Sequence, residues 1–357
     1  KVTPLTTAKF GFYCTGSTPC TFKCKLDTKP WKGCSSPKTY KGLPAGAHTF
    51  KVKAIDRYGN IDPSPAKYSW EIYQWASVEA GDLHTCATRT NGSLWCWGSN
   101  EKGQLGDGTT ANKKVPTQVA GTGWASVSAG FTHTCATKTD TTLWCWGNNG
   151  AFQLGDGTTG DKKVPTQVAG TGWASVATGG GHTCATKTDA SLWCWGYGGY
   201  GQLGDGTWGW DNVPTQVAGP NWAGVTVGYA HTCATKTDAT LWCWGYNLMS
   251  ELGDGTTTNK NVPTQVSGAS WDSVAAGYWH TCARKTDASL WCWGYGVDGQ
   301  LGDGTNVDKN VPTQVSGASW EGASAGGWHT CATKTDTNLW CWGANTRGQL
   351  GDGTNID

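Results

Sequence analysis

His133-Thr134-Cys135-Ala136-Thr137-Lys138-Thr139-Asp140-Thr141-Thr142-Leu143-Trp144-Cys145-Trp146-Gly147 is one of six close copies of the same stretch. The His-Thr-Cys triplets begin at positions 84, 133, 182, 231, 280 and 329, and the Trp-Cys-Trp-Gly quartets begin at positions 95, 144, 193, 242, 291 and 340. Both series therefore advance by 49 residues without slippage. A repeat of this length indicates a solenoid, a propeller or a linear array.

Each repeat contains four short segments that predict strands. They are Val-Pro-Thr-Gln-Val (115–119), Trp-Ala-Ser-Val (124–127), the His-Thr-Cys run and the Leu-Trp-Cys-Trp run, and Gly, Asp, Asn and Thr separate them. The repeat shows no helical period. The 53 Gly of the chain fit the many tight turns of an all-β protein, which is the fold class we expect.

The spacing of the two cysteines predicts how the central hairpin pairs. If Cys135 faces Cys145 across antiparallel strands, the residues 139–141 remain for a short turn. Side chains alternate along a strand, so the two faces of the hairpin differ in content. One face carries His133, Cys135, Thr137, Leu143 and Cys145, and the other carries Thr134, Ala136, Trp144 and Trp146.

Both faces of this hairpin are substantially apolar, so both have to be covered. A radial stack of small sheets covers them, with each indole filling the wedge toward the neighbouring sheet. We therefore expect a β-propeller with one four-stranded blade per 49 residues, preceded by a small β-sandwich at 1–73. The six repeats of the propeller (74–357) start near Trp75, Trp124, Trp173, Trp222, Trp271 and Trp320.

Composition limits the classes of function. The chain has 357 residues, 24 Trp, 37% hydrophobic residues and a net charge of +1. That charge gives no general electrostatic argument for nucleic acid or an anionic membrane, so neither nucleic acid binding nor membrane insertion is expected. No apolar run is long enough to span a bilayer. The chain opens at Lys1 without a signal peptide, which indicates a processed or partial product.

The repeat resembles a known family. Trp-Ala-Ser-Val-x-Ala-Gly-x-x-His-Thr, then Leu-Trp-Cys-Trp-Gly-x-Asn, then Gly-Gln-Leu-Gly-Asp-Gly-Thr, as in 75–109, is similar to the regulator-of-chromosome-condensation repeat. The resemblance covers about 75–357 and recurs six times. It implies a propeller that usually has seven blades, whereas six repeats are present here. Two Cys per repeat depart from the nuclear members and favour a secreted, bacterial variant.

The ends of the repeat array differ from its middle. The Val-Pro-Thr-Gln-Val segment precedes repeats two to six but is missing before Trp75, and the chain stops at Asp357 just before another copy is due. We interpret the missing copy as a strand that would close the ring by completing the first blade. On this hypothesis the native chain continues, or another molecule supplies the strand.

Residues 10–72 alternate polar and apolar positions between turn signals, which predicts a small β-sandwich. They resemble the immunoglobulin-like or fibronectin-like modules of bacterial surface proteins. Such modules usually have a strand before the one at 9–13, so either the N-terminus is trimmed or a strand comes from elsewhere. The resemblance places a bridge between Cys24 and Cys34 and leaves Cys14 and Cys20 for a smaller loop, although four Cys allow three pairings.

The sixteen Cys favour disulfides over zinc. The array has no Cys-x2-4-Cys spacing, and its cysteines sit ten positions apart. Disulfides imply an oxidising compartment, so we expect an extracellular or cell-surface location. The pairs expected within the repeats are Cys86 with Cys96, Cys135 with Cys145, Cys184 with Cys194, Cys233 with Cys243, Cys282 with Cys292, and Cys331 with Cys341.

The repeated His and Asp are residue types that bind metal ions, but their spacing does not favour a metal site. Equivalent His lie far apart around a ring, so a buried imidazole bonded to backbone is expected rather than a metal or haem ligand. Each Asp of the Leu-Gly-Asp-Gly-Thr motif stands alone, which favours a turn-stabilising role over calcium. No Gly-x-Ser-x-Gly motif or Ser/His/Asp set stands out. We expect no cofactor, no metal, no catalytic residue and no enzyme activity.

The loops that break the repetition are rich in aromatic residues, which dominate recognition surfaces. The alternative is that some of these rings only cover the mouth of the central channel. The candidate binding residues are Tyr197, Tyr200, Trp208, Trp210, Tyr229, Tyr246, Tyr278, Trp279, Tyr295 and Trp328.

These features predict an extracellular structural or adhesive protein, a surface or filament component that assembles with protein partners, including copies of itself joined through the unpaired ends. The alternative is a secreted propeller that inhibits or regulates a protein. The resemblance supports this alternative, because related propellers include a secreted β-lactamase inhibitor protein and a nuclear exchange factor for a small GTPase. Disulfides disfavour the exchange activity.

Overall fold

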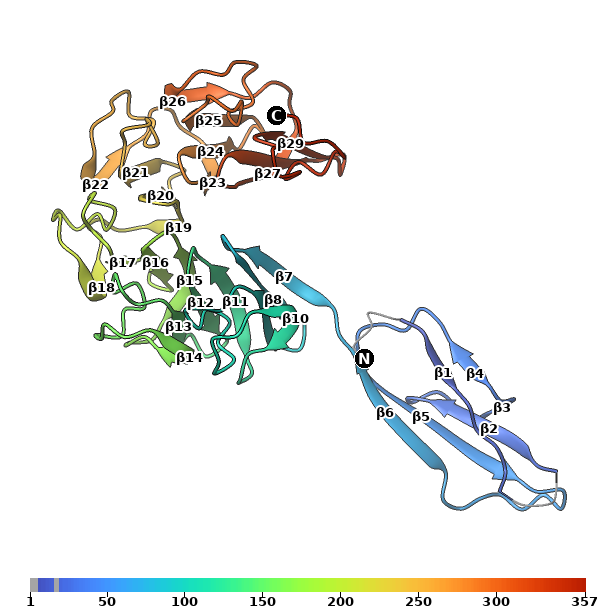
Figure 1. The fold of residues 1–357 in the computed structure, drawn as a ribbon. Coiled ribbons are helices and arrows are strands. Elements are labelled where there is room, and N and C mark those ends of the chain that lie inside the picture. The colour runs from blue at the N-terminus through green and yellow to red at the C-terminus, as the bar shows by residue number, and fades with distance from the viewer. Residues whose placement is uncertain (1–5, 16–18) are drawn as a thin grey trace. The chain divides into compact units, whose positions relative to one another are not determined.

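The computed structural model describes residues 6–15 and 19–357, and this part of the chain consists of strands, turns and loops without a helix (Figure 1). It therefore contains no helix long and apolar enough to cross a membrane. The chain divides into two compact units. We call Lys1–Ala76 with Arg89–Asn91 the N-terminal unit, and Ser77–Thr88 with Gly92–Asp357 the repeat unit.

The N-terminal unit contains two antiparallel sheets that share a core. One sheet pairs β1 with β4, and the other has the order β3-β2-β5-β6. Phe10 of β1 stacks on Phe50 of β5 at 4.2 Å between ring centroids, and Cys24 and Val52 are buried beside Phe50. The strands are β1 (Ala8–Phe10), β2 (Thr21–Leu26), β3 (Lys32–Cys34), β4 (Lys38–Tyr40), β5 (Gly46–Ile55) and β6 (Ala66–Ile72).

In the repeat unit, each 49-residue repeat forms one antiparallel sheet, or blade. The first five sheets have four strands and the last has three in the described residues. The strands of the first three blades are β7 (Trp75–Ala80), β8 (His84–Arg89), β9 (Leu94–Gly98), β10 (Lys113–Gln118), β11 (Trp124–Ala129), β12 (His133–Lys138), β13 (Leu143–Gly147), β14 (Lys162–Gln167), β15 (Trp173–Thr178), β16 (His182–Lys187), β17 (Leu192–Gly196) and β18 (Asp211–Gln216). Those of the last three are β19 (Trp222–Val227), β20 (His231–Lys236), β21 (Leu241–Gly245), β22 (Lys260–Gln265), β23 (Trp271–Ala276), β24 (His280–Lys285), β25 (Leu290–Gly294), β26 (Lys309–Gln314), β27 (Trp320–Ala325), β28 (His329–Lys334) and β29 (Leu339–Gly343).

The central hairpin has the predicted register. Cys135 lies opposite Cys145, Ala136 opposite Trp144 and Thr134 opposite Trp146, and the same pairing occurs in every repeat. The first strands of successive blades, such as β11 and β15, contact each other, so these strands line the centre (Figure 1). Repeated four-stranded sheets arranged in this way are the blades of a β-propeller.

Neighbouring blades are joined by apolar layers to which each blade contributes a different face. Between the second and third blades, Leu143 and the Cys135–Cys145 bridge pack against Trp173 and Trp195. The same layer recurs between the other consecutive blades. The alternation of Trp with Ala, Cys and Leu in the sequence predicts this packing, in which large indoles are buried against small or branched side chains.

The expectation that a further copy of the Val-Pro-Thr-Gln-Val segment would complete the first blade is wrong. Each copy is the fourth strand of the preceding repeat's blade, because β10 pairs with β9 and β14 pairs with β13. The first blade already has four strands, in the order β10-β9-β8-β7. The sheet that has only three strands in the described residues is the last one, β27-β28-β29. A further copy would therefore complete the last blade, not the first.

Candidate functional site

The loops that carry the candidate aromatic residues lie at one end of the repeat unit. In an antiparallel meander, the turn between the first and second strands and the loop between the third and fourth strands emerge at the same edge. Tyr229, Tyr278, Trp279 and Trp328 lie in turns of the first kind, and Tyr197 lies in a loop of the second kind. The topology therefore brings together positions that are far apart in the sequence.

Three rings meet at the centre of this end. Phe131 contacts Tyr229 and Tyr278 at 6.0 and 6.1 Å between centroids, and Tyr229 contacts Tyr278 at 5.6 Å. These rings come from the second, fourth and fifth blades, and the Tyr278 hydroxyl donates a hydrogen bond to the Asp82 carboxylate of the first blade. Burial, and after it this carboxylate, raises the pKa of the Tyr278 phenol. The centre is thus closed by contacts that cross the propeller.

Two glycines make room for these rings. A Cβ at Gly180 would lie 2.5 Å from the Tyr229 carbonyl oxygen and 2.9 Å from its ring, and a Cβ at Gly327 would lie 3.4 Å from the Tyr278 ring. Gly180 and Gly327 occupy the positions at which other repeats have Phe131, Tyr229 and Tyr278. Large and small residues in this column therefore interdigitate, which is the packing expected of a filled centre.

A line of ring contacts runs outward from the centre across several blades. Trp279 contacts Tyr229 at 5.2 Å and Tyr246 at 5.5 Å, and Tyr246 contacts Tyr200 at 5.0 Å. The line then continues through Tyr197 and Trp210 to Phe152, with centroid distances of 5.5, 4.8 and 5.9 Å. On the other side, Tyr278 contacts Trp328 at 5.3 Å. We call these connected residues the aromatic face: Phe131, Phe152, Tyr197, Tyr200, Trp210, Tyr229, Tyr246, Tyr278, Trp279 and Trp328.

The third and fifth repeats lack an asparagine that the other four share, and in the third repeat this change lies where the aromatic face is densest. Repeats one, two, four and six have an Asn two residues after the Trp-Gly pair, and its Nδ2 donates to the following loop, as Asn149 does to the carbonyl oxygen of Thr158 at 2.8 Å. The third repeat has Gly198 instead, and a Cβ there would lie 1.6 Å from the Gly209 carbonyl oxygen. The loop can therefore fold inward, which seats Trp210 against Tyr197.

Several of these rings are exposed enough to bind another molecule. Trp210 has 48% of its surface exposed and Trp328 has 44%, whereas the central Phe131 and Tyr278 are half-buried. The half-buried rings fill the centre, and the exposed rings are accessible to another molecule. Of the predicted residues, Trp208 is exposed and Tyr295 half-buried, and neither makes a ring contact among the described residues.

Sequence reasoning missed other apolar residues of this end. Phe131 and Phe152 complete the line of rings, and Leu248, Met249 and Val297 are exposed in the third-to-fourth-strand loops. Leu248 and Met249 stand where the first repeat has Glu101 and Lys102. Comparing the six repeats column by column would have found this change from charged to apolar residues.

The aromatic face has a buried carboxyl beneath it. Glu251 is fully buried, its Oε2 accepts the Met249 backbone N–H at 3.0 Å, and its Oε1 has no partner. Burial raises the pKa of Glu251 to about 8. The pKa of Tyr246 is also raised, first by burial and then by Glu251. At neutral pH the carboxyl is therefore mainly protonated, and this end of the repeat unit stays apolar.

The repeated histidines join blades instead of binding backbone, which corrects the sequence interpretation. His133 Nε2 lies 2.9 Å from Thr183 Oγ1 of the next blade, and Thr183 donates to the Gln153 carbonyl oxygen at 2.8 Å. Because the Thr proton is used there, Nε2 of the histidine must donate to the Thr oxygen. Burial lowers the pKa of His133 to about 3. Equivalent bonds link the other consecutive blades.

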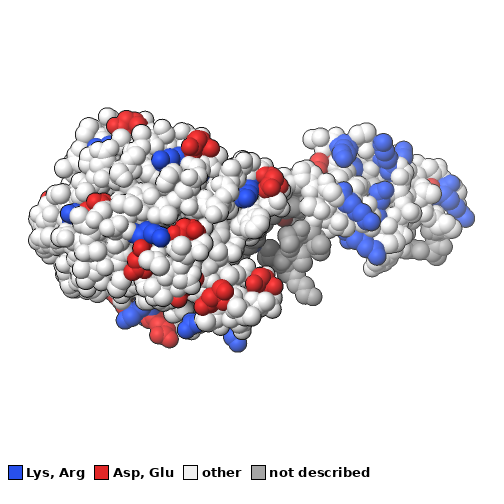
Figure 2. Space-filling model, turned by 90° about the horizontal axis from the view of Figure 1, so that it is seen from above, with Lys and Arg blue, Asp and Glu red and all other residues white. Residues whose placement is uncertain are grey.

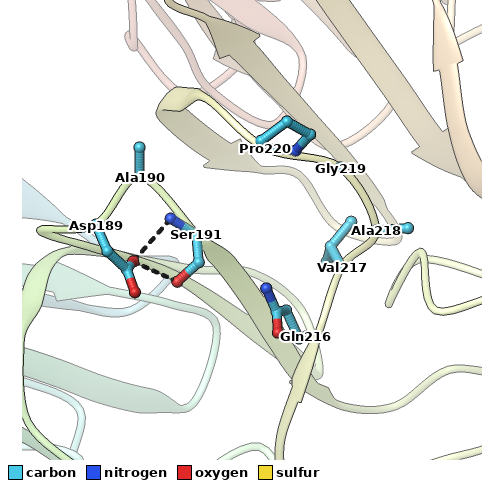
Figure 3. A pocket seen from close by; sticks show the side chains of 8 residues that line it. All are labelled: Asp189, Ala190, Ser191, Gln216, Val217, Ala218, Gly219 and Pro220. Carbon is cyan, nitrogen blue, oxygen red and sulfur yellow. Dashed lines mark hydrogen bonds between the residues drawn. The ribbon is translucent and has the colours of Figure 1, made fainter.

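The repeated aspartates stabilise turns. Asp156 Oδ1 accepts the Thr158 backbone N–H at 2.9 Å and the Thr158 hydroxyl at 2.7 Å, while Lys162 lies 3.3 Å from its Oδ2. Asp189 does the same for Ser191 at the opposite end of its blade, where a hollow of about 530 Å³ lies between two turns (Figure 3). Figure 3 shows that this carboxylate is turned toward the Ser191 backbone and hydroxyl. The hollow therefore offers no free reactive group.

All sixteen cysteines are in disulfides. In the repeat unit each bridge spans the central hairpin, as in Cys184–Cys194. In the N-terminal unit the bridges are Cys14–Cys20 and Cys24–Cys34. Eight disulfides fit an oxidising environment.

A family model described as the RCC1-like domain matches residues 73–357, the whole span of the repeats. The chain belongs to the RCC1-like domain family. The resemblance carried by the repeat motifs is thereby confirmed. In this RCC1-like domain the two Cys of every repeat form a bridge that holds the central hairpin together.

Solved structures agree on the fold. Human WBSCR16 is 19% identical, with a TM-score of 0.68 over 82% of this chain and 85% of that one. Yeast RCC1 (Prp20) bound to Kap60 is 19% identical, with a TM-score of 0.71 over 79% and 73%. Prp20p from Saccharomyces cerevisiae, a structure described together with its binding to Gsp1p and histones, is 18% identical, with a TM-score of 0.64 over 87% and 90%. At such identities the likeness of this RCC1-like domain to each structure is one of fold.

Proposed function

We propose that this chain is an extracellular, non-enzymatic binding protein that captures a protein partner on its aromatic face. The observation that carries the proposal is the unbroken line of ring contacts across five blades, with Tyr200, Trp210, Tyr229 and Trp328 left exposed. Exposed Trp and Tyr supply most of the binding free energy at protein interfaces, and contiguous apolar surface of this kind marks such sites.

Other observations support the proposal. Yeast RCC1 (Prp20), which has the same fold, is described in complex with Kap60, so one protein that contains this fold binds another protein. Rigid aromatic anchors bind at low entropic cost, and here the inner turns are held by backbone bonds such as Gly180 N–H to the Tyr229 carbonyl oxygen at 3.2 Å. Trp208 and Tyr295 are proposed to extend the surface.

The extracellular location rests on the disulfides, because they persist in oxidising compartments and are rare in the cytosol. The N-terminal unit has two sheets that share a core, in keeping with the proposal that it is an immunoglobulin-like or fibronectin-like module of a bacterial surface protein. In such an arrangement one unit can be devoted to attachment and the other to capture.

The test uses a phage-displayed peptide library selected on the full chain. Peptides with apolar anchors should be enriched, and Trp208→Ser, Trp210→Ser and Trp328→Ser combined should weaken their binding at least tenfold. The matched control is Val164→Ser with Val213→Ser, which removes exposed apolar side chains from the outer strands β14 and β18. Equal binding by wild type and the Trp variant would refute capture by the aromatic face.

A second candidate function, assembly with copies of the same chain, is favoured by the faces at the two ends of the blade array. Leu339 of the last blade is 67% exposed, although the equivalent leucines of the other five blades are fully buried. Val78 of the first blade is 63% exposed, whereas Val127 at the same place in the second blade is 6% exposed. The two faces are the complementary halves of an inter-blade layer, so copies can join end to end.

Sedimentation velocity tests this assembly. We expect association that grows with concentration and that Leu339→Asp abolishes, because the carboxylate would be buried in an apolar layer. Leu248→Asp, which changes an exposed leucine in the loop between β21 and β22, is the control and should leave association unchanged. A wild type that stays monomeric up to its solubility limit would rule the assembly out.

A further inference from the structure

The charges of the chain are segregated between its two units. Residues 1–73 contain twelve basic and four acidic residues, whereas residues 74–357 contain fifteen basic and twenty-two acidic ones. The overall charge of +1 is therefore the sum of a strongly basic N-terminal segment and an acidic repeat segment. Figure 2 shows Lys and Arg gathered over the N-terminal unit with few carboxylates among them.

Five lysines share one face of the sheet β3-β2-β5-β6. Lys23 lies directly opposite Lys53, Lys25 opposite Lys51, and Lys51 opposite Lys67. Paired residues point to the same side of a sheet, so the backbone positions of these lysines form a grid spaced by about 4.8 Å across the strands and about 6.7 Å along them. We call Lys23, Lys25, Lys51, Lys53 and Lys67 the lysine face.

Like charges directly opposite one another destabilise a sheet, and among the described residues no ion pair offsets this cost. None of the five lysines forms an ion pair within the described part of the chain. The nearest acidic groups on this side are engaged elsewhere. Asp27 accepts the Thr49 backbone N–H at 2.7 Å and binds His48 Nδ1 at 2.9 Å, and Glu71 bonds to the Tyr73 phenol.

The lysines of the repeat unit show the contrast. Lys113 lies 3.0 Å from an Asp107 oxygen, and Lys309 lies 3.1 Å from an Asp303 oxygen. Lys187 sits between two indoles, 4.6 Å from the Trp173 centroid and 4.5 Å from that of Trp193. These lysines therefore have partners within their own unit, whereas the lysine face has no carboxylate partner among the described residues.

We propose that the lysine face binds a linear anionic polysaccharide that carries one carboxylate or sulfate at regular intervals. Lysines act as point charges, which suit a spaced row of single anions better than the forked recognition typical of arginine. Trp31 lies beside the face, with its ring 4.7 Å from Lys53 Nζ, and offers an indole on which a sugar ring can stack. The hydroxyls of Thr49 and Ser69 lie on the same side, 3.1 Å apart, and can bond to sugar hydroxyls.

The surface fits other polyanions less well. Single-stranded nucleic acid is held by several stacking rings in succession, and Trp31 is one ring at the rim. Reading a DNA duplex usually involves an element that enters a groove, whereas this face is the flat side of a sheet. Stable membrane binding usually adds large apolar side chains among the charges, whereas most strand positions of this face carry lysine, threonine or serine.

The choice of polysaccharide over nucleic acid also uses the extracellular location proposed above. The site itself rests on a different unit from the aromatic face. Polysaccharide binding can therefore fail while peptide capture succeeds, or peptide capture can fail while polysaccharide binding succeeds. Measuring both ligands with the lysine variants and the Trp variants distinguishes failure of one proposal from failure of the other.

The experiment is isothermal titration calorimetry of the full chain with a defined-length oligogalacturonate at low salt. We expect binding that weakens steadily with added salt and is absent for the fully methyl-esterified oligomer, which has the same backbone without the charge. Lys25→Gln with Lys51→Gln should reduce affinity about tenfold. The matched control is Lys29→Gln with Lys41→Gln, which removes the same charge from exposed loop positions of the same unit.

Three results would overturn the proposal. They are no binding by wild type, an equal loss in the Lys29/Lys41 control, and tighter binding of a DNA duplex than of the oligogalacturonate at the same salt. Trp31→Ala should weaken oligogalacturonate binding at unchanged net charge, which a purely electrostatic surface would not do. The thermal unfolding of each variant establishes that a loss is not due to misfolding of the N-terminal unit.

Discussion

Glu251 is the residue at which one repeat departs from the other five, which have Gln at this place. A Gln here accepts the backbone N–H two residues earlier and can donate through its amide, as Gln153 Nε2 does to Asn148 Oδ1 at 2.7 Å. In the fourth repeat the partner of the amide is replaced by Tyr246, and the carboxyl oxygen Oε1 is left without a bond. The fourth repeat thus has a buried acid where the other repeats have a neutral amide.

The raised pKa of Glu251 predicts an effect on stability with a definite sign. The folded-state pKa of about 8 exceeds the ordinary value of 4.5, so the folded protein holds the proton more tightly than the unfolded chain. This contribution is fully present below about pH 4.5 and is lost as the pH rises to about 8. Glu251→Gln should therefore stabilise the protein, little at pH 4 and by on the order of a few kcal/mol at pH 8. Guanidinium unfolding at several pH values measures it.

The reciprocal substitution provides the control for this prediction. Gln202→Glu places the same acid at the equivalent buried position of the preceding blade. It should destabilise the protein increasingly between pH 4 and pH 8. A Glu251→Gln variant whose advantage does not change with pH would contradict the argument.

At the scale of the element, the central hairpin is the unit that the chain repeats and that each disulfide closes. Cys184–Cys194 and Cys233–Cys243 enclose loops of the same length in adjacent blades. By the loop-entropy relation each bridge stabilises the fold by about 2 to 3 kcal/mol. Cys184→Ala with Cys194→Ala should lower the unfolding free energy by that amount, measured by guanidinium denaturation. The Cys233 and Cys243 pair changed in the same way should give the same loss, and a markedly unequal loss would mean that packing dominates.

The hairpin is also where the sequence was most informative. Cys spacing and strand alternation define its register, because opposite residues of two antiparallel strands have a constant sum of numbers. The Val-Pro-Thr-Gln-Val segment was harder to place, since sequence order does not say whether a strand pairs with the repeat before it or after it. The histidine partner lies in the next blade, 50 residues away, beyond the reach of a local pattern.

The residues of the aromatic face could largely be predicted from the sequence, but their contacts could not. Rings that break the repetition stand out in the sequence, whereas their contacts depend on which loops the blades bring together. Leu248 and Met249 were missed because single aliphatic residues in a loop carry no periodic signal. The lysine face was missed because the net charge was counted over the whole chain, and the averaging concealed alternate lysines on three adjacent strands.

At the scale of the whole molecule, the inter-blade bonds of histidine make stability depend on pH across the entire array. Burial lowers the pKa of His133, His182, His231 and His280 to about 3 and that of His84 to about 4. In the unfolded chain each imidazole has a pKa near 6.5. Every consecutive pair of blades from the first to the sixth is joined by one such bond, so all these interfaces respond to acid together.

The unfolded chain therefore binds more protons than the folded one between about pH 6.5 and pH 3, and the free energy of unfolding must fall as the pH drops through this window. We expect a loss on the order of several kcal/mol between pH 7 and pH 4 in guanidinium titrations. The pKa of Glu251 is shifted in the opposite sense, so the pH dependence of the unfolding free energy should be measured in the Glu251→Gln variant.

In that variant, His231→Gln should make the pH dependence of the unfolding free energy shallower by about one proton, because only its own imidazole is removed. The turn aspartates such as Asp254, whose pKa values are lowered, lose their contribution at lower pH than the histidines. Stability that stays constant from pH 7 to pH 4 would show that the histidines are not held neutral between the blades.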